Sequence, residues 1–112
     1  MEFRSTCPIA RTLDIVGDKW TLLIIRDLSL GKTHFDEFLG SREGIAPNIL
    51  ANRLQTLSAL GLIAKSISPA DRRRVQYRLT QRGEDFRSLA KLLAQWGMAH
   101  MPGVERTTAE RL

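Results

Sequence analysis

The feature that most constrains this fold is a change of hydrophobic spacing at Gly61. Before Gly61 the apolar residues recur at helical intervals of three and four, whereas residues 75–79 alternate apolar and polar side chains with a period of two. A shorter strand-like run, 62–67, precedes them, and the intervening Ser-Pro-Ala-Asp at 68–71 predicts a turn. The sequence therefore predicts a β-hairpin after a set of helices, with three consecutive arginines at its tip: Arg72, Arg73 and Arg74.

A helix-turn-helix is predicted directly before the hairpin. Thr33 and Asp36 form a weakened capping box for a short helix, the glycine-containing segment 40–44 makes a turn, and Pro47 starts a second helix that runs to about Leu60. Two short helices joined by a tight turn that contains glycine are typical of a helix-turn-helix. The predicted fold class is thus mainly α with a small β-hairpin, a winged helix-turn-helix.

Three further helices complete the predicted chain. Pro8 and Asp18 suit the starts of two helices near the N-terminus, and Thr80 caps a long last helix that ends at Pro102-Gly103. A chain of 112 residues has room for one domain. We assign this domain to residues 1–103 and expect residues 104–112 to form a flexible C-terminal tail.

The net charge of +5 comes entirely from the middle of the chain. Residues 1–39 hold five Lys and Arg against six Asp and Glu, residues 40–82 hold eight against two, and residues 83–112 hold four against four. A basic surplus concentrated on one segment is expected for a protein with a polyanionic partner. The alternative is a solvated basic face without a partner.

The helix over 47–60 has a buried face and a polar face. Leu50, Leu54 and Leu57 face the core on a helical wheel. The opposite side is nearly uncharged, and its amide side chains suit the N6/N7 edge of adenine, while a small alanine permits contact with a thymine methyl. We expect this recognition helix to enter the major groove and to contact DNA through Pro47, Asn48, Ala51, Asn52 and Gln55. The helix start at Pro47 is also a candidate to present the backbone N–H groups of its first turn to a phosphate. The alternative is an ordinary polar helix surface.

Arginines surround this helix in places better suited to phosphates than to bases. Arg42 lies in the turn and Arg53 at the border of the buried face. In the wing, residues 68–74, the three consecutive arginines repel one another, and Asp71 is the only acid nearby in the sequence. We therefore expect double-stranded DNA as the partner, with its minor groove or backbone contacted by Arg72, Arg73, Arg74 and Arg78.

The long last helix carries an apolar stripe that so small a core cannot bury. This predicts a homodimer interface formed by the first and last helices. The residues expected there are Ile9, Leu13, Phe86, Leu89, Leu93 and Trp96.

Cys7 lies at the start of the first helix, where the helix dipole favours the thiolate. It is a candidate redox or electrophile sensor, and the alternative is a small buried hydrophobe. A single cysteine excludes an intramolecular disulfide and fits a cytoplasmic protein. The longest apolar run, Leu22–Ile25, is far too short for a membrane span, and no secretory signal is predicted.

Enzyme functions lack the necessary residues. The two histidines, His34 and His100, are far apart in the sequence, no glycine-rich phosphate loop is present, and no Cys or His pair has metal-ligand spacing. The sequence predicts a protein that is not an enzyme and uses no cofactor and no metal.

Taken together, these segments resemble the HxlR family of bacterial winged-helix regulators. The matching residues are Cys7-Pro8, Leu13, Gly17-Asp18-Lys19-Trp20-Thr21, Leu28, Gly31, Phe35, Ile45, Leu50, Arg53-Leu54, Leu57, Gly61-Leu62-Ile63, Tyr77-Arg78-Leu79-Thr80, Gly83 and Trp96. The resemblance implies a homodimer on palindromic operators, here expected to be a repressor, and some members sense oxidants or electrophiles through the cysteine that Cys7 matches. The chain departs from the family at Ala46, where a serine cap is usual, and in its wing, where prolines are common.

Two other functions stay open from the sequence. One is a winged helix used as a protein-interaction module, which would not account for the basic middle segment. The other is a ligand-sensing regulator that binds a small aromatic effector at the dimer interface near Trp20 and Trp96.

Overall fold

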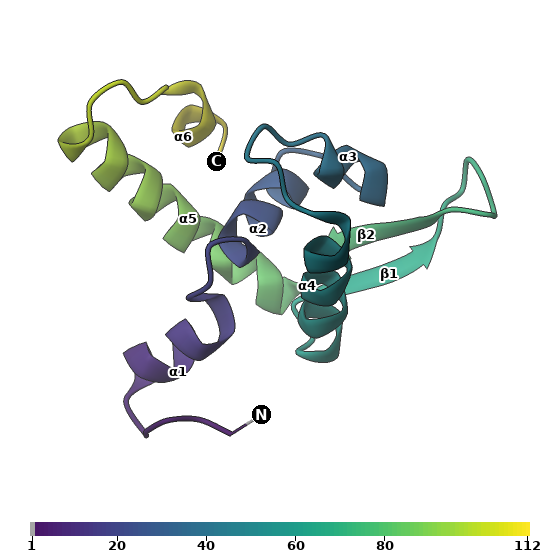
Figure 1. Cartoon of the computed structure of the whole chain (residues 1–112), viewed down its shortest axis with the longest axis horizontal. Helices are drawn as coiled ribbons and strands as arrows, with labels where there is room; N and C mark the ends of the chain where they lie inside the picture. Colours follow the sequence, from purple (N-terminus) through teal and green to yellow (C-terminus); the bar gives the residue numbers. More distant parts are fainter. Residues whose placement is uncertain (1) are drawn as a thin grey trace.

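The computed structural model describes residues 2–112. Its helices and strands follow the order helix, helix, helix, helix, hairpin, helix, helix (Figure 1). Their bounds are α1 (Pro8–Val16), α2 (Thr21–Ser29), α3 (Phe35–Leu39), α4 (Pro47–Ala59), β1 (Ile63–Ile67), β2 (Val75–Leu79), α5 (Gln81–His100) and α6 (Thr107–Arg111). This arrangement confirms the mainly helical fold with a two-stranded antiparallel hairpin.

The hydrophobic core lies between α2, α3, α4 and the first strand. The amphipathic helix α4 turns one side inward, as its leucine spacing predicts. The core consists of Ile24, Phe38, Ile45, Leu50, Leu54, Leu57, Leu62 and Ile63. Burying such side chains removes apolar surface from water, which holds the helix-turn-helix and the base of the hairpin in one body.

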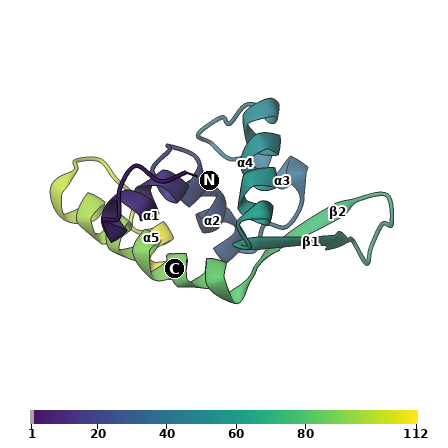
Figure 2. The same ribbon diagram turned by 90° about the horizontal axis from the view of Figure 1, so that it is seen from below.

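The hairpin pairs β1 with β2 from Ile63 opposite Leu79 to Ile67 opposite Val75. It projects away from the helices, and its loop is the far end of the molecule (Figures 1 and 2). At the start of α3, an isolated bridge joins His34 to Gln76, so β2 also pairs with a short extended segment on its other edge. The base of the hairpin is therefore tied to the helix-turn-helix through the backbone.

The helix starts were predicted with mixed success. Asp18 accepts hydrogen bonds from the backbone N–H groups of Trp20 and Thr21, both at 3.0 Å, and Thr80 accepts one from Gly83 at 3.2 Å. Thr80 therefore caps its helix as expected, whereas Asp18 caps the turn before α2, whose N-cap is Trp20. The predicted box of Thr33 and Asp36 is wrong: Glu37 accepts from the backbone N–H of His34. The helix starts one residue later than expected, because His34 is still extended.

The C-terminal segment differs from the expected flexible tail. Residues 107–111 form the short helix α6, which folds back beside α5 (Figure 1). Ala109 is buried, and Arg87 of α5 donates a hydrogen bond to the backbone oxygen of Leu112 at 3.3 Å. Because these contacts join positions far apart in the sequence, local patterning did not predict them. Over residues 2–112 no helix is long and apolar enough to cross a membrane.

Candidate nucleic-acid interface

Helix α4 exposes the polar side predicted for it. Leu50, Leu54 and Leu57 are buried. The side chains on the opposite face, Asn48, Ala51, Asn52 and Gln55, are all exposed. Because three buried leucines fix the rotation of the helix, this amide-bearing face cannot turn inward without emptying the core.

The start of α4 has no side-chain cap. Ala46 is extended, with φ −71° and ψ 145°, and Pro47 occupies the first turn. A helix start without a capping side chain leaves backbone N–H groups of its first turn open to an external acceptor. The absence of a side-chain cap is expected, because Ala46 stands where a serine is usual in the HxlR family.

A groove separates α4 from the hairpin. It is lined by Phe35, Ala51, Gln55, Lys65 and Tyr77, among others. Lys65 on β1 thus lines the same groove as Gln55. The sequence analysis did not assign this lysine to the site. Lys65 could have been placed here from the strand pattern, because it lies opposite Tyr77 in the hairpin.

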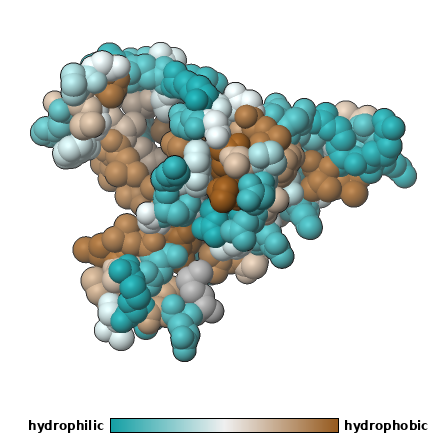
Figure 3. All heavy atoms as spheres, in the orientation of Figure 1, coloured by the Kyte–Doolittle hydropathy of each residue, from teal (hydrophilic) through white to brown (hydrophobic). Residues whose placement is uncertain are grey.

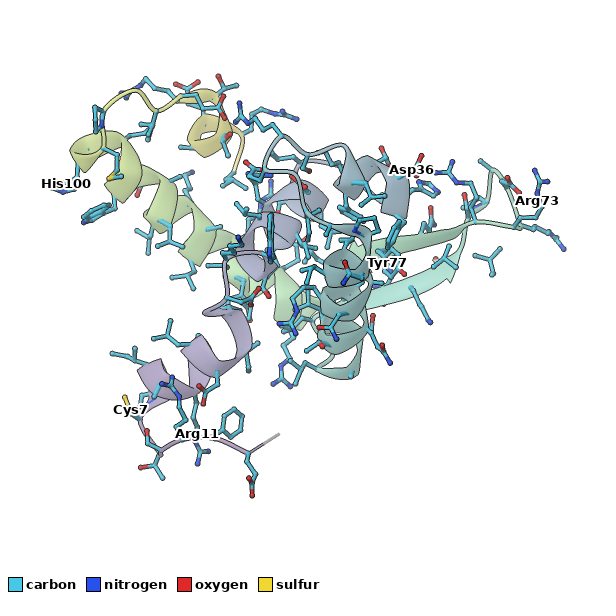
Figure 4. The ribbon with its side chains drawn as sticks, viewed as in Figure 1. Cys7, Arg11, Asp36, Arg73, Tyr77 and His100 are labelled. Atoms are coloured by element: carbon cyan, nitrogen blue, oxygen red, sulfur yellow. The ribbon has the colours of Figure 1, made fainter. Side chains whose placement is uncertain are left out.

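The wing loop is closed at its neck by backbone hydrogen bonds. Ser68 donates to the carbonyl of Arg74 at 2.8 Å, and Arg74 donates to the carbonyl of Asp71 at 2.9 Å. The buried Ser68 hydroxyl lies 3.2 Å from Nε2 of His34, at the start of α3. The neck of the wing is therefore fixed against the helix-turn-helix, while Arg73 lies at its tip (Figure 4).

Most of the arginines predicted to hold phosphates already pair with carboxylates of the same chain. Arg73 lies 3.2 Å from Asp71 and Arg74 lies 2.5 Å from Asp36 of α3. The expectation that Asp71 alone relieves the repulsion in the wing is therefore wrong. Asp36, 38 residues away in sequence from Arg74, also supplies negative charge.

The two arginines near the helix-turn-helix are paired as well. Arg53 donates to Oδ1 of Asn52 at 2.7 Å and lies 3.6 Å from Asp18. Arg42 pairs with Glu105, which precedes α6. The hydrogen bond and charge of Arg42 hold the pKa of Glu105 below its usual range. Within residues 2–112, Arg72 and Arg78 make no ion pair, so they are the site arginines that a phosphate could reach without displacing a carboxylate.

An ionic cluster that the sequence analysis missed lies behind the turn between α3 and α4. Buried Asp27 accepts a hydrogen bond from Ser41 at 2.5 Å and lies 2.9 Å from Arg26 and 3.6 Å from Lys32. Arg26 also contacts Glu43 at 2.8 Å, and this hydrogen bond raises the pKa of Arg26 despite its partial burial. The cluster connects α2 to the turn, which fixes where α4 begins.

The residues predicted for a dimer interface divide into two groups. Ile9, Leu13, Leu93 and Trp96 are exposed, and Ile9 retains 70% of its accessible surface. Phe86 is instead partly buried against the core of its own chain, so it offers less surface to a second copy. Sequence periodicity could not separate Phe86 from Leu93 and Trp96, because all three lie on one stripe of α5.

An apolar groove runs between α1, α2 and α5. Its lining includes Ile9, Leu13, Leu22, Leu89 and Leu93. Apolar side chains gather where α1 and α5 face each other, whereas the tip of the wing is hydrophilic (Figure 3). The predicted aromatic-binding pair does not come together in this groove: Trp20 packs against the core, and Trp96 stacks on His100 with ring centroids 4.7 Å apart.

Cys7 is exposed at the outer end of α1, directly before its first residue (Figure 4). The alternative of a buried hydrophobe therefore does not hold for the single chain. No cluster of three metal-binding side chains occurs among the described residues.

This combination of fold and surface matches a known family. The model of the HxlR-like helix-turn-helix family matches residues 15–105. The chain belongs to the HxlR-like helix-turn-helix family. The sequence-based resemblance is thereby confirmed, and the fold is a helix-turn-helix of the HxlR-like type.

Individual relatives support the same assignment. An uncharacterized HTH-type transcriptional regulator of Mycobacterium tuberculosis is 37% identical over 97 residues, which cover 87% of this HxlR-like chain and 61% of the relative. The chain therefore spans about three fifths of the length of that relative. The crystal structure of PA1607, a candidate transcription factor, superposes with a TM-score of 0.82 at 37% identity and covers 92% of this chain and 72% of PA1607. The redox regulator HypR in its oxidized form has a TM-score of 0.76 at 27% identity, over 84% of this chain and 97% of HypR.

Proposed function

We propose that this HxlR-like chain acts in the cytoplasm as a homodimeric repressor that binds a palindromic operator. Helix 47–60 enters the major groove, and the wing, residues 68–74, contacts the minor groove or the backbone. The observation that carries this proposal is that the uncharged amide face of α4 borders a hairpin whose tip carries three arginines. Amides supply base selectivity, whereas arginines supply the attraction to phosphates.

The homodimer part of the proposal rests on the exposed apolar side chains of α1 and α5. Ile9, Leu13 and Leu93 border one groove. Helix α1 and the outer part of α5 lie at the opposite end of the molecule from the wing (Figure 2). A second copy that covers this groove would leave both recognition helices free. Two helices related by a two-fold axis meet successive major grooves of a palindrome about 34 Å apart.

DNA binding is tested first by selecting bound sequences from a random duplex pool and measuring the salt dependence of the affinity. With roughly 8–10 phosphate contacts per dimer, log affinity should fall with log salt at a slope near −7 to −9. Arg72→Gln should reduce the slope by about one per subunit with little loss of sequence preference. Lys91→Gln, which removes an exposed cation of α5 outside the proposed DNA surface, is the matched control and should leave the slope unchanged. A wild-type protein that binds no DNA at low salt would instead favour the protein-interaction module.

Redox control through Cys7 is a second part of the proposal. It is supported by the exposed thiol at the start of α1 and by the similarity to HypR, which is described as a redox regulator. The test compares operator affinity and selected sequences for protein reduced with a thiol and protein oxidised with diamide. We expect oxidation to change the affinity of the wild-type protein and to leave Cys7→Ser unaffected. Equal binding by reduced and oxidised wild-type protein would exclude the sensor.

A further inference from the structure

We infer that Asp36 competes with DNA phosphates for Arg74 and thereby sets the affinity of the wing. This inference rests on the proposed DNA-binding function and assigns a role to a residue of α3 outside the recognition helix and the wing. Asp36 is 38 residues from Arg74 in the sequence, and the structure brings Oδ1 of Asp36 to 2.5 Å from Nη2 of Arg74. In Figure 4, Asp36 lies on the side of α3 that faces the hairpin.

Asp36 is not needed to cap α3, although its charge in the first turn also complements the helix dipole. The start of α3 is already satisfied by Glu37, which accepts from the backbone N–H groups of His34 at 2.9 Å and Thr33 at 3.1 Å. Among residues 2–112, the carboxylate of Asp36 makes hydrogen bonds only to Arg74. Its side chain is 72% exposed, so burial does not hold it in place.

Arg74 is held at the neck of the wing by its backbone, independently of Asp36. Its N–H donates to Asp71 and its carbonyl accepts from Ser68. Because these bonds fix the backbone, the guanidinium can leave Asp36 and turn to a phosphate without moving the wing. A guanidinium binds carboxylate and phosphate oxygens with the same fork of N–H groups, so the two anions exclude each other at one edge of the group.

The net charge of the wing indicates how strongly Asp36 can change the affinity for DNA. Residues 68–74 carry a net charge of +2, and Asp36 lowers the local charge to +1. Because phosphate neutralisation dominates the affinity of DNA-binding proteins, a carboxylate paired with a wing arginine weakens binding at every sequence. Asp36 therefore limits affinity without contacting a base.

The test measures the dissociation constant for a selected operator and for an unrelated duplex between 50 and 200 mM salt. Asp36→Asn should tighten binding to both duplexes by about three- to tenfold, and the salt slope should become steeper by about one per subunit. Asp36→Glu, which keeps the charge, should behave as wild type. Glu110→Gln removes one exposed carboxylate on α6, remote from the wing (Figure 1), and should change binding less than twofold.

A double-substitution cycle separates competition from a general change in charge. Arg74→Gln should cost less than about twofold in the wild-type background, where Asp36 already occupies the arginine, and several-fold more in the Asp36→Asn background. Weaker binding by Asp36→Asn would show that the pair holds the wing in place and would overturn the inference. An effect equal to that of Glu110→Gln, or an additive cycle, would also overturn it. In those cases wild-type binding still supports the proposed function, whereas no wild-type binding at low salt rejects both.

Discussion

Gln55 projects from the exposed face of α4 and lines the groove between α4 and the hairpin together with Lys65. Its amide can donate to and accept from one base edge in the major groove at the same time. Gln55→Ala should therefore relax the preference at one operator position by about 1–3 kcal/mol. The measurement is the affinity for operators altered at single positions. Gln95→Ala on α5 is the control, and unchanged discrimination by Gln55→Ala would refute the role of this side chain.

Replacing either of two glycines of α5 by alanine should have opposite effects on stability. A Cβ at Gly83 would lie 2.0 Å from the carbonyl oxygen of Leu62, which also accepts the N–H of Thr80 at 3.1 Å. A Cβ at Gly97 would meet no atom within 4 Å. Gly83→Ala should lower the free energy of unfolding by about 1–3 kcal/mol or more, because backbone must move. Gly97→Ala should raise it by about 0.5–1 kcal/mol, because alanine favours a helix interior.

Urea denaturation of the two glycine variants beside the wild type checks this pair of predictions. Each variant adds one methyl group to the same helix, so any general effect of added bulk is matched. Equal free energies of unfolding for Gly83→Ala and the wild type would show that the approach of α5 to Leu62 is not as close as described.

At the scale of elements, helix α3 depends on Glu37 for its start. Hydrogen bonds from the backbone N–H groups of Thr33 and His34 lower the pKa of Glu37 from 4.5 to about 2. Because the pKa of Glu37 is lower in the folded protein than in the unfolded chain, ionised Glu37 stabilises the fold above about pH 4.5. This stabilisation is lost as the pH falls toward 2. Glu37→Ala should destabilise the protein at pH 7 by about 0.5–1 kcal/mol, a small value because the side chain is solvent-exposed. The difference from wild type should shrink between pH 4.5 and 2.

Glu37→Gln is the control for the titration. Glutamine keeps an oxygen that accepts the same backbone hydrogen bonds but carries no ionisable group. Denaturation from pH 2 to pH 7 should show a gap between Glu37→Gln and Glu37→Ala that does not vary with the charge of this position. A constant gap between wild type and Glu37→Ala over the whole range would contradict the proposed linkage.

Local patterns predicted the elements because their causes are local. The leucines at 50, 54 and 57 bury α4, and the alternation of 75–79 forms β2 as expected. The cap of α3 was assigned to the wrong residues because Thr33 and His34 can both precede a helix, and only the fold shows which is extended. The site was predicted as a set of residue types, namely amides on α4 and arginines in the wing.

The pairing of these residues could not be predicted from the sequence. Asp36 meets Arg74, and Glu105 meets Arg42 across 63 positions, through contacts that no short spacing encodes. The same holds for α6, whose burial of Ala109 depends on the position of α5. Phe86 was assigned to the dimer surface because its spacing matches that of Leu93, and only the packing shows that it is partly buried against the core.

At the scale of the whole molecule, the wing loop with its arginines and the apolar groove are separated. The wing and α4 lie toward one end, and the outer parts of α1 and α5 lie toward the other (Figures 1 and 2). The apolar groove is therefore remote from the surface that we propose for DNA. This separation allows a second copy to cover α1 and α5 while both recognition helices stay exposed.

Leu93 offers the sharpest test of that arrangement, because it is 52% exposed and lines the apolar groove. Leu93→Lys should leave the fold intact but prevent dimer formation, since an unpaired ammonium group would be buried in the interface. Ser88→Lys adds the same charge at an exposed position of α5 outside the groove lining and should stay dimeric.

Light scattering at micromolar protein measures the mass of each variant, and circular dichroism confirms that its helices remain. We expect monomers for Leu93→Lys, dimers for wild type and Ser88→Lys, and a loss of operator affinity that follows the loss of the dimer, because a monomer contacts only one half-site. A monomeric wild type would reject the homodimer, and a dimeric Leu93→Lys would place the interface elsewhere on the molecule.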